Sequence, residues 1–323
     1  MFEIQADLCF RELRGFLDYC EKVKKSSEQT VYNYYRDLMM FFRYMKFIKG
    51  QGSPVQKIDT IPVMDIDVDF LNSINIDDIY RYIDYLKITR NNSPRTVTRR
   101  STVLRMFFRY LCVTTGAIED DPTEKLELPA IKKEPPKFMS ENDCITLLNS
   151  IDGQNSERDY CILVILINCG IRLSELVRLN DHDIKPDGTV TVREKNTTRT
   201  IYFNKACMEA LDEYKDFKEK FFEGKRYDRH AVFVGKGGKR LTGRWIEQIV
   251  KKRMENAGFG DKGLSPNKLR HTAATIMYRK GVDLSVMKDI LGHKDMTSTQ
   301  IYANADSDKV EKAMKGISVS RKK

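Results

Sequence analysis

A charged, proline-rich stretch at residues 119–137 constrains the fold of this 323-residue chain more than any other feature. It reads EDDPTEKLELPAIKKEPPK and contains four prolines. Proline fixes φ and lacks a backbone N–H, so neither a helix nor a central strand continues through such a stretch. Segments of this composition commonly join domains. We therefore expect two domains, at residues 1–118 and 138–323, connected by this linker.

The chain before the linker shows the apolar periodicity of helices. Residues 8–48 predict two amphipathic helices, and the second of these can be capped by Ser27 or Thr30. The apolar stripe of the second helix, which we assign to a core rather than to base stacking, comprises Val31, Tyr34, Tyr35, Leu38, Met39, Phe42 and Met45. Residues 50–75 contain Gly, Pro and alternating acids, and they predict a loop or a short irregular excursion.

Two more helices are expected before the linker. Residues 76–88 place apolar side chains on one face, and the next helix can be capped by Ser93 with Pro94 in its first position. This last helix is rich in arginine, which suits contacts with phosphate groups. The first domain is therefore predicted to be all-helical.

The chain after the linker combines helices with one hairpin. A capped helix is expected to begin at Ser140, with Asp143 completing the cap. The apolar run CILVILINCGI at residues 161–171 is too short to span a bilayer and predicts a buried helix. Residues 189–203 alternate on both sides of a polar turn, which predicts a β-hairpin. Further helices are expected at residues 204–222, 242–257 and 266–280, and in a last group at 283–315. The predicted fold class is mainly α with a small β-sheet.

The charge of the chain favours a polyanionic partner, most simply nucleic acid, because its net charge is +10 and its pI is about 9.1. Its seven cysteines are scattered without a CxxC pair, and its four histidines show no metal-ligand spacing with them. The N-terminus, MFEIQADLCF, lacks the basic segment of a signal peptide. We therefore expect reduced thiols, no structural metal and a cytoplasmic location.

Three short stretches of the second domain form a recognisable pattern. They are GIRLSEL at residues 170–176, LRHTAATIMYRKGVDL at residues 269–284 and LGHKDMTSTQIY at residues 291–302. In order and spacing they resemble the signature boxes of the tyrosine recombinase/integrase family, most closely its Xer-type and phage- or transposon-integrase members. The first domain resembles, more loosely, the helical SAM-like core-binding domain of that family. The resemblance implies two domains that close as a clamp around double-stranded DNA.

The reaction that this resemblance implies is the cutting and rejoining of DNA through a phosphotyrosyl bond. It needs an oxygen nucleophile in line with the phosphate, cations that neutralise the growing charge, and an acid for the leaving 5′-oxygen. Tyr302, nine residues after His293 of the LGH box, corresponds to the nucleophile. Tyr278 is its nearest rival, which we assign to the core of the preceding helix. Because the phosphotyrosyl bond retains the energy of the cut bond, no ATP, metal or other cofactor is implied.

Arg172 and Arg270 correspond to the phosphate clamp of the family, since guanidinium groups bind phosphate oxygens in pairs and stay charged. Glu175, one helical turn after Arg172, corresponds to an acidic residue that orients the pocket. His293 corresponds to a hydrogen-bond donor to the scissile phosphate. His271, directly after Arg270, is expected to be structural.

Two positions depart from the usual pattern of the family. Lys195 corresponds to the hairpin lysine that protonates the leaving oxygen. Family hairpins often read GKG there, whereas this chain reads EKN, and Arg193 and Arg199 are competing cations. The family usually has a histidine three residues before the second arginine, where this chain has Asn267 in the stretch NKLRH. An amide can hydrogen-bond to a phosphate but cannot relay a proton, so phosphate contact is the catalytic role expected of Asn267.

Both domains are expected to contact DNA through basic and hydroxyl side chains. The candidates for these contacts are Arg95, Arg99, Arg100, Lys239, Arg240, Thr242 and Arg244. The C-terminal stretch SDKVEKAMKGISVSRKK suggests a final helix with a basic end. In related recombinases such a helix docks on the neighbouring protomer, which implies a homotetramer on two DNA sites. The alternative is a helix that packs on its own chain.

The leading interpretation is site-specific recombination between two duplexes through a Holliday junction. A type IB topoisomerase, which applies the same chemistry to one duplex, is the alternative enzyme. The alternative from another class is a catalytically weak DNA-binding regulator. The helical first domain and the LGH box favour the recombinase. Asn267 gives the regulator some weight, whereas the four intact positions argue against it; these are Arg172, Arg270, His293 and Tyr302.

Overall fold

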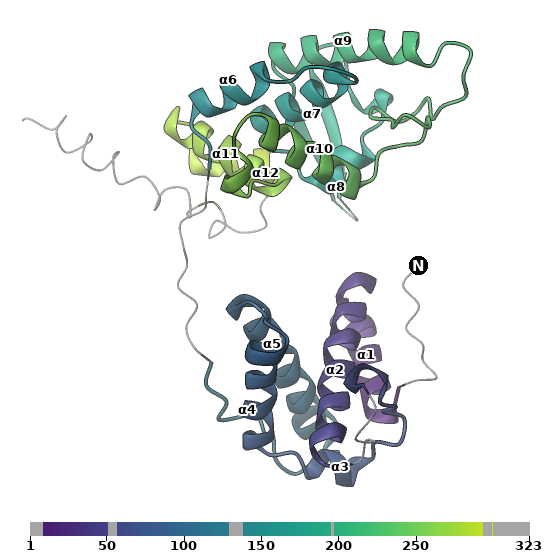
Figure 1. Ribbon diagram of the computed structural model, residues 1–323, viewed down its shortest axis with the longest axis vertical. Coiled ribbons are helices and arrows are strands. Elements are labelled where there is room, and N and C mark those ends of the chain that lie inside the picture. The colour runs from purple at the N-terminus through teal and green to yellow at the C-terminus, as the bar shows by residue number, and fades with distance from the viewer. Residues whose placement is uncertain (1–8, 51–56, 129–137, 195–196, 293–298, 300–323) are drawn as a thin grey trace, which may run out of the picture. The chain divides into compact units, whose positions relative to one another are not determined.

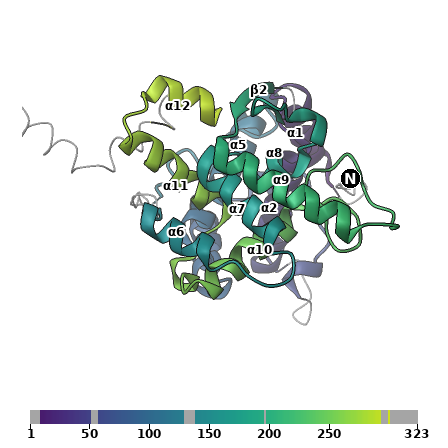
Figure 2. The same cartoon turned by 90° about the horizontal axis from the view of Figure 1, so that it is seen from above.

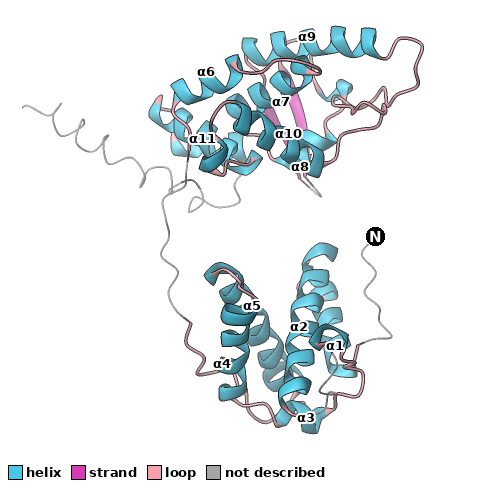
Figure 3. Cartoon of the chain, in the orientation of Figure 1, coloured by secondary structure: helices cyan, strands magenta, loops and turns pink. Residues whose placement is uncertain are grey.

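The protein is described by a computed structural model at residues 9–50, 57–128, 138–194 and 197–292 and at Thr299. The chain divides into two compact units, Met1–Lys133 and Glu134–Lys323 (Figure 1). Helices form most of both units, and a two-stranded sheet lies in the second unit (Figure 3). The predicted fold class, mainly α with a small β-sheet, is therefore confirmed.

The first unit is a set of helices around an aromatic core. Its elements are α1 (Arg11–Lys22), α2 (Glu28–Ile48), α3 (Val68–Asn72), α4 (Ile76–Asp84) and α5 (Pro94–Arg109), with π-helical turns at Tyr85–Thr89 and Tyr110–Thr115 and a 3-10 turn at Ile58–Thr60. The apolar stripe of α2 packs inward, and Phe42 meets Phe107 of α5 with ring centroids 5.4 Å apart. The assignment of this stripe to the core is thus confirmed.

Two of the predicted helix starts are present as expected. The Ser27 hydroxyl accepts a hydrogen bond from the backbone N–H of Thr30 at 3.2 Å, which caps α2. Ser93 caps α5 in the same way, with Pro94 in the first turn of the helix. Both caps satisfy backbone donors that a helix leaves unpaired at its N-terminus.

Residues 50–75, predicted to be a loop or a short irregular excursion, contain a 3-10 turn and the short helix α3 in the part that is described, residues 57–75. Asp67 accepts a hydrogen bond from the backbone N–H of Phe70 at 2.8 Å and so begins α3. Ile61 and Val63 are fully buried in the first unit, while acidic residues between the apolar ones face solvent. Contact with the rest of the core, which local sequence does not reveal, stabilises this segment.

The first unit also extends past residue 118. Leu126 is buried in its core, and its carbonyl accepts a hydrogen bond from the Arg105 guanidinium of α5. The backbone N–H of Glu127 donates to the Tyr80 hydroxyl at 3.3 Å. The start of the proline-rich stretch therefore packs on the first unit, because apolar side chains alternate there with charged ones.

The second unit is built around α7 (Ser156–Cys169), which packs against four other helices (Figure 2). These are α6 (Glu141–Asn149), α9 (Lys205–Phe221), α10 (Gly243–Asn256) and α11 (Pro266–Arg279). The short helices α8 (Leu173–Arg178) and α12 (Leu284–Leu291) and 3-10 turns at Asp181–Asp183 and Gly260–Lys262 complete it. The run at residues 161–166 is fully buried, which confirms the predicted buried helix. The expected capping box of Ser140 and Asp143 begins α6.

The predicted hairpin is formed by β1 (Thr189–Glu194) and β2 (Thr197–Tyr202), which pair antiparallel. Val190 lies opposite Ile201, and Val192 lies opposite Arg199. Both valines and Ile201 are buried, so this face of the hairpin packs on the core of the unit. The helices expected on both sides of the hairpin are also present as α6, α7, α9, α10 and α11. In the last expected group, residues 283–315, α12 is described and most residues after it are not.

No helix in the described parts of the chain is long and apolar enough to cross a membrane. All seven cysteines are free thiols and six of them are buried, as the scattered pattern predicted. The side chains that the structure describes contain no cluster of three or more His, Cys, Asp or Glu that could hold a metal ion.

Candidate active site

Arg172 is placed by the glycine turn that ends α7. Gly170 has φ +57°, and a Cβ built on it would lie 2.8 Å from Cδ2 of Leu291 and 3.3 Å from Cβ of Ala273. A side chain at residue 170 would therefore separate α7 from α11 and α12. Two residues later, Arg172 begins α8, and its backbone N–H donates to Oε2 of Glu175 at 2.8 Å.

Arg270 lies in α11 and is almost completely buried beside the same turn. Its Nη1 donates to the carbonyl of Gly170 at 2.6 Å, and its Nη2 donates to the carbonyl of Leu291 at the end of α12. Arg172 also reaches this end, since its Nη2 donates to the carbonyl of Gly292. The two arginines, which are far apart in the sequence, are thereby brought to one place.

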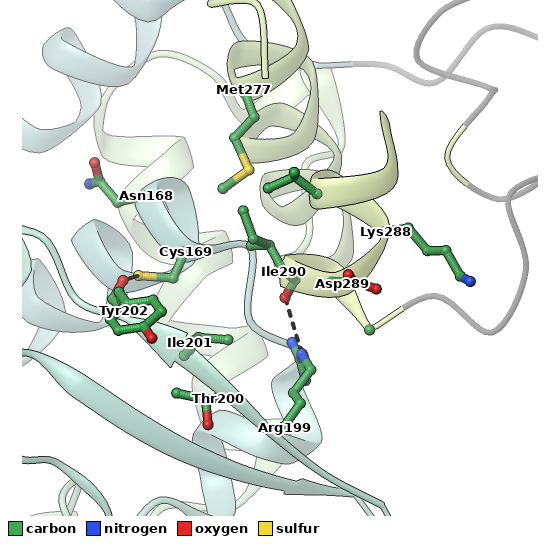
Figure 4. Close-up of a pocket in the computed structure, with 12 residues that line it drawn as sticks. Asn168, Cys169, Arg199, Thr200, Ile201, Tyr202, Met277, Lys288, Asp289 and Ile290 are labelled. Carbon is green, nitrogen blue, oxygen red and sulfur yellow. Dashed lines mark hydrogen bonds between the residues drawn. The ribbon is translucent and has the colours of Figure 1, made fainter. Parts of the chain in front are cut away.

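A third arginine completes this arrangement. Nε of Arg199, in β2, donates to the carbonyl of Ile290 at 3.0 Å (Figure 4). Three consecutive carbonyls at the end of α12 are thus each capped by a different guanidinium group. The C-terminus of a helix has unpaired carbonyls and a partial negative charge, so cations stabilise it. These hydrogen bonds therefore hold α8, α11 and the hairpin against the C-terminal end of α12.

The Glu175 carboxylate lies between two of these arginines. Its side chain is fully buried, and Oε1 accepts hydrogen bonds from Nη1 of Arg172 at 3.3 Å and from Nη1 of Arg199. The expected contact of Glu175 with Arg172 is therefore present. The contact with Arg199 was not expected, although the sequence held a signal for it. Arg199 alternates with the buried Ile201 and Phe203, so it points to the buried face and needs an anionic partner there.

An open hollow of about 670 Å³ lies over Arg172 and Arg270. Asn267 is exposed on the first turn of α11, three residues before Arg270, and lines this hollow with them. Gly243, at the start of α10, lines it from another side. Arg178 and Ser174 of α8 also line it, so the hollow offers three arginines, one hydroxyl and one amide, which can all donate hydrogen bonds to an anion.

Three predicted site residues lie outside the described residues: Lys195, His293 and Tyr302. The two cations that compete with Lys195 are described, and both are engaged. Arg193 forms an ion pair with the buried Asp183, and Arg199 forms one with Glu175. Neither of them is among the described residues that line the hollow over Arg172.

His271 and Tyr278 sit in structural environments. His271 is half-buried in α11, and this burial, together with the neighbouring Arg270 charge, holds the pKa of its imidazole below the usual value. Tyr278 packs against the small apolar cluster that joins α11 to α12. Both placements fit the structural roles expected for these residues.

The predicted DNA-contact residues fall into two groups. Arg95, Lys239, Thr242 and Arg244 are exposed, and Thr242 also caps α10. The others are held by contacts within the chain. Arg99 and Arg100 pair with the buried Asp37, and Arg240 donates to the carbonyls of Val177 and Leu179 at 3.0 Å each. Arg99 is itself exposed despite its ion pair, so the side chains suited to bind a partner are those of Arg95, Arg99, Lys239, Thr242 and Arg244.

Comparisons with known proteins match this chain to recombinases. The model of the Phage integrase family matches residues 137–309. The tyrosine recombinase XerC of Caldanaerobacter subterraneus subsp. tengcongensis is 38% identical over 303 residues, which cover 94% of this chain and 85% of that protein. XerC of Oceanobacillus iheyensis is 31% identical, and the match covers 92% of each chain.

Solved structures of recombinases share the fold. The Tn1549 transposon integrase in complex with a circular intermediate DNA matches with a TM-score of 0.70 at 18% identity, covering 96% of this chain and 100% of that chain. The XerH recombinase bound to its difH substrate matches with a TM-score of 0.67 at 18% identity, covering 94% of this chain and 84% of that chain.

Proposed function

Since this chain belongs to the phage integrase family, we propose that it cuts and rejoins DNA through a 3′-phosphotyrosyl bond formed by Tyr302. It is a tyrosine-type site-specific recombinase that acts on double-stranded DNA. The observation that carries the proposed mechanism is the hollow in which Arg172, Arg270 and Asn267 converge. We place the reaction in the cytoplasm, as expected from the sequence.

The first step is the binding of the scissile phosphate. Arg172 and Arg270 donate hydrogen bonds to its non-bridging oxygens and neutralise the negative charge that builds up during attack. Asn267 adds a neutral donor from the exposed side of the hollow. Glu175 fixes the orientation of Arg172, and its ion pairs with Arg172 and Arg199 offset the charge that would otherwise repel the phosphate.

The second step is the exchange of one phosphorus–oxygen bond for another. Tyr302 loses its phenolic proton to solvent, its oxygen attacks phosphorus and forms the tyrosyl ester, and the bond from phosphorus to the 5′-oxygen breaks. Lys195 gives a proton to that oxygen, and His293 donates a hydrogen bond to the phosphate. All three residues lie within the range matched by the family model. The engagement of Arg193 and Arg199 in ion pairs supports Lys195 as the acid.

Religation reverses these bonds with the 5′-hydroxyl of a second duplex, which produces a Holliday junction. A type IB topoisomerase would religate the original strand, and a regulator would not cut at all. The XerC relatives, which match nearly the full length of the chain, favour the recombinase over both alternatives.

Strand exchange requires several protomers, and an open groove of about 650 Å³ supports the predicted tetramer on two DNA sites. The groove lies between β2, α11 and α12, and its described lining includes the apolar side chains of Met277, Val286 and Ile290 (Figure 4). We infer that the predicted C-terminal helix, at residues 307–323, docks in this groove of the neighbouring protomer.

A covalent-adduct assay tests the proposed function. The target site is first selected from a pool of random duplexes by the full chain, and a nicked suicide duplex carrying it is then incubated with the protein. We expect a DNA–protein adduct for the wild type and none for Tyr302→Phe. Tyr278→Phe is the matched control and should retain the adduct. Absence of an adduct with the wild type, or an adduct with Tyr302→Phe, would overturn the proposal.

A further inference from the structure

Two buried carboxylates lie beside the hairpin, and each is paired with an arginine from a different strand. The side chain of Glu175 is fully buried and that of Asp183 is 2% exposed. Arg199 of β2 pairs with Glu175, and Arg193 of β1 pairs with Asp183. A buried carboxylate without a partner is strongly destabilising, so these ion pairs hold the two strands against their surroundings.

Both carboxylates are themselves fixed in place. Oδ2 of Asp183 accepts a hydrogen bond from the backbone N–H of Asn180 at 3.0 Å. Oε2 of Glu175 accepts one from the backbone N–H of Arg172 at 2.8 Å. The two arginines of the hairpin therefore bind to rigid anchors rather than to flexible surface side chains.

The two ion pairs act on opposite faces of the hairpin. Val192 lies opposite Arg199, and Arg193 lies opposite Thr198. Because consecutive residues of a strand point to opposite faces, Arg193 and Arg199 point in opposite directions. The next pair, Glu194 with Thr197, is the last pair of the register before Lys195 in the sequence. The hairpin is thus held on both faces within two residue pairs of the end of the strands that Lys195 follows.

We propose that Arg193 and Arg199 are positioning residues that hold Lys195 at the leaving 5′-oxygen. The buried valines and Ile201 hold one face of the hairpin on the core, and the two ion pairs add anchors nearer the ends of the strands at Glu194 and Thr197. Proton transfer needs the donor within hydrogen-bond reach of the oxygen, and a displacement of about 1 Å can slow a reaction by about 100-fold. This inference rests on the proposed role of Lys195 as the acid.

The test separates proton donation from the other steps. Single-turnover cleavage is measured on two suicide duplexes, one with the natural 5′-oxygen at the scissile phosphate and one with sulfur in its place. A thiolate leaves without protonation, so the sulfur duplex does not need the acid. We expect Arg193→Ala to cut the oxygen duplex about 10- to 100-fold more slowly than the wild type. It should cut the sulfur duplex within about threefold of the wild-type rate, because Arg193 pairs with Asp183 and not with the residues that hold Arg172 and Arg270. Arg199→Lys should also cut the oxygen duplex more slowly than the sulfur duplex, although its contacts with Glu175 and Ile290 make it slower than the wild type on both.

Two controls distinguish failure of this inference from failure of the proposed function. Lys195→Ala should be slow on the oxygen duplex and fast on the sulfur duplex; a Lys195→Ala protein that is slow on both defeats the assignment of the acid. Thr198→Ala, an exposed change opposite Arg193, should match the wild type on both. If Lys195→Ala is rescued by sulfur while Arg193→Ala stays slow on it, or if Arg193→Ala and Arg199→Lys cut the oxygen duplex at the wild-type rate, the positioning role is wrong. Loss of folding would slow both duplexes and counts against it too.

Discussion

Asn267 is the residue at which this site departs most from the usual pattern of its family. It is exposed at the start of α11, so a change of its side chain should have little effect on folding. Its amide can hydrogen-bond to a phosphate, whereas an imidazole can do so and also transfer a proton. We therefore expect Asn267→His to leave the single-turnover cleavage rate unchanged or to raise it. A large loss of rate, with DNA affinity unchanged, would show that Asn267 does not occupy the place of that histidine.

His271, four residues after Asn267, supports a prediction about pH. Its burial and the charge of Arg270 lower the pKa of its imidazole. In the unfolded chain the pKa of a histidine is about 6.5, so His271 is protonated at a lower pH in the folded chain than in the unfolded one. The neutral imidazole therefore stabilises the fold above pH ~6.5, and this stability is lost as the pH falls through the folded pKa. In urea unfolding, His271→Gln should lose less free energy of unfolding between pH 7 and 5 than the wild type. Equal losses would contradict this account.

At the scale of single residues, the sequence predicted those contacts that local spacing determines. Arg172 and Glu175 are one helical turn apart, and their contact follows from that spacing. The convergence of Arg172 with Arg270 was predicted by resemblance alone, because their positions depend on how α7 and α11 pack. The contact of Arg199 with Glu175 was not predicted, because Arg199 was considered only as a cation that competes with Lys195 for the catalytic role. Its position on the inward-facing side of the strand was not taken into account.

The C-terminal end of α12 is the element that links the site together. Gly292 follows it with φ +63°, and a Cβ built there would lie 2.9 Å from Cδ and Nε of Arg199 and 3.1 Å from Nη1 of Arg172. The glycine is thus required both by its backbone conformation and by the two guanidinium groups that pack on it.

Gly292→Ala should affect cleavage as well as stability. The left-handed conformation costs alanine roughly 1–2 kcal/mol, and the added methyl group displaces Arg172 and Arg199. We expect cleavage to slow by about 100-fold, as for a misplaced catalytic group. Gly281→Ala is the matched control, because Gly281 has φ +86° and no atom within 4 Å of its built Cβ. Gly281→Ala should lose a similar free energy of unfolding but cleave DNA at the wild-type rate. Equal cleavage rates for Gly281→Ala and Gly292→Ala would show that the added methyl group at residue 292 does not displace the arginines.

The elements themselves were largely predictable, and the exceptions have a common cause. Caps at Ser27, Ser93 and Ser140 and the alternation of the hairpin are local signals, and each identified its element. The helix α3 and the packed segment around Leu126 lie in charged stretches with isolated apolar residues. Such residues become structured only through contact with a core formed elsewhere in the chain, so local pattern does not reveal them.

At the scale of the whole molecule, the clamp that the family resemblance implies requires both units to contact DNA. Arg95 in the first unit and Arg244 in the second are exposed on the first turns of α5 and α10. Each phosphate that a protein neutralises releases counterions, so binding weakens with salt in proportion to the number of phosphate contacts.

We expect Arg95→Ala and Arg244→Ala each to reduce the slope of log Kobs against log[salt] by about 1, and the double variant to reduce it by about 2. Fluorescence anisotropy of a labelled duplex over a salt series measures these slopes. Arg240→Ala is the comparison, because Arg240 donates to the carbonyls of Val177 and Leu179 and its loss should leave the slope near that of the wild type. A full reduction for Arg244→Ala with none for Arg95→Ala would mean that Arg95 binds no phosphate. The contribution of the first unit to the clamp would then have to come from other residues, whereas equal reductions place phosphate contacts on both units.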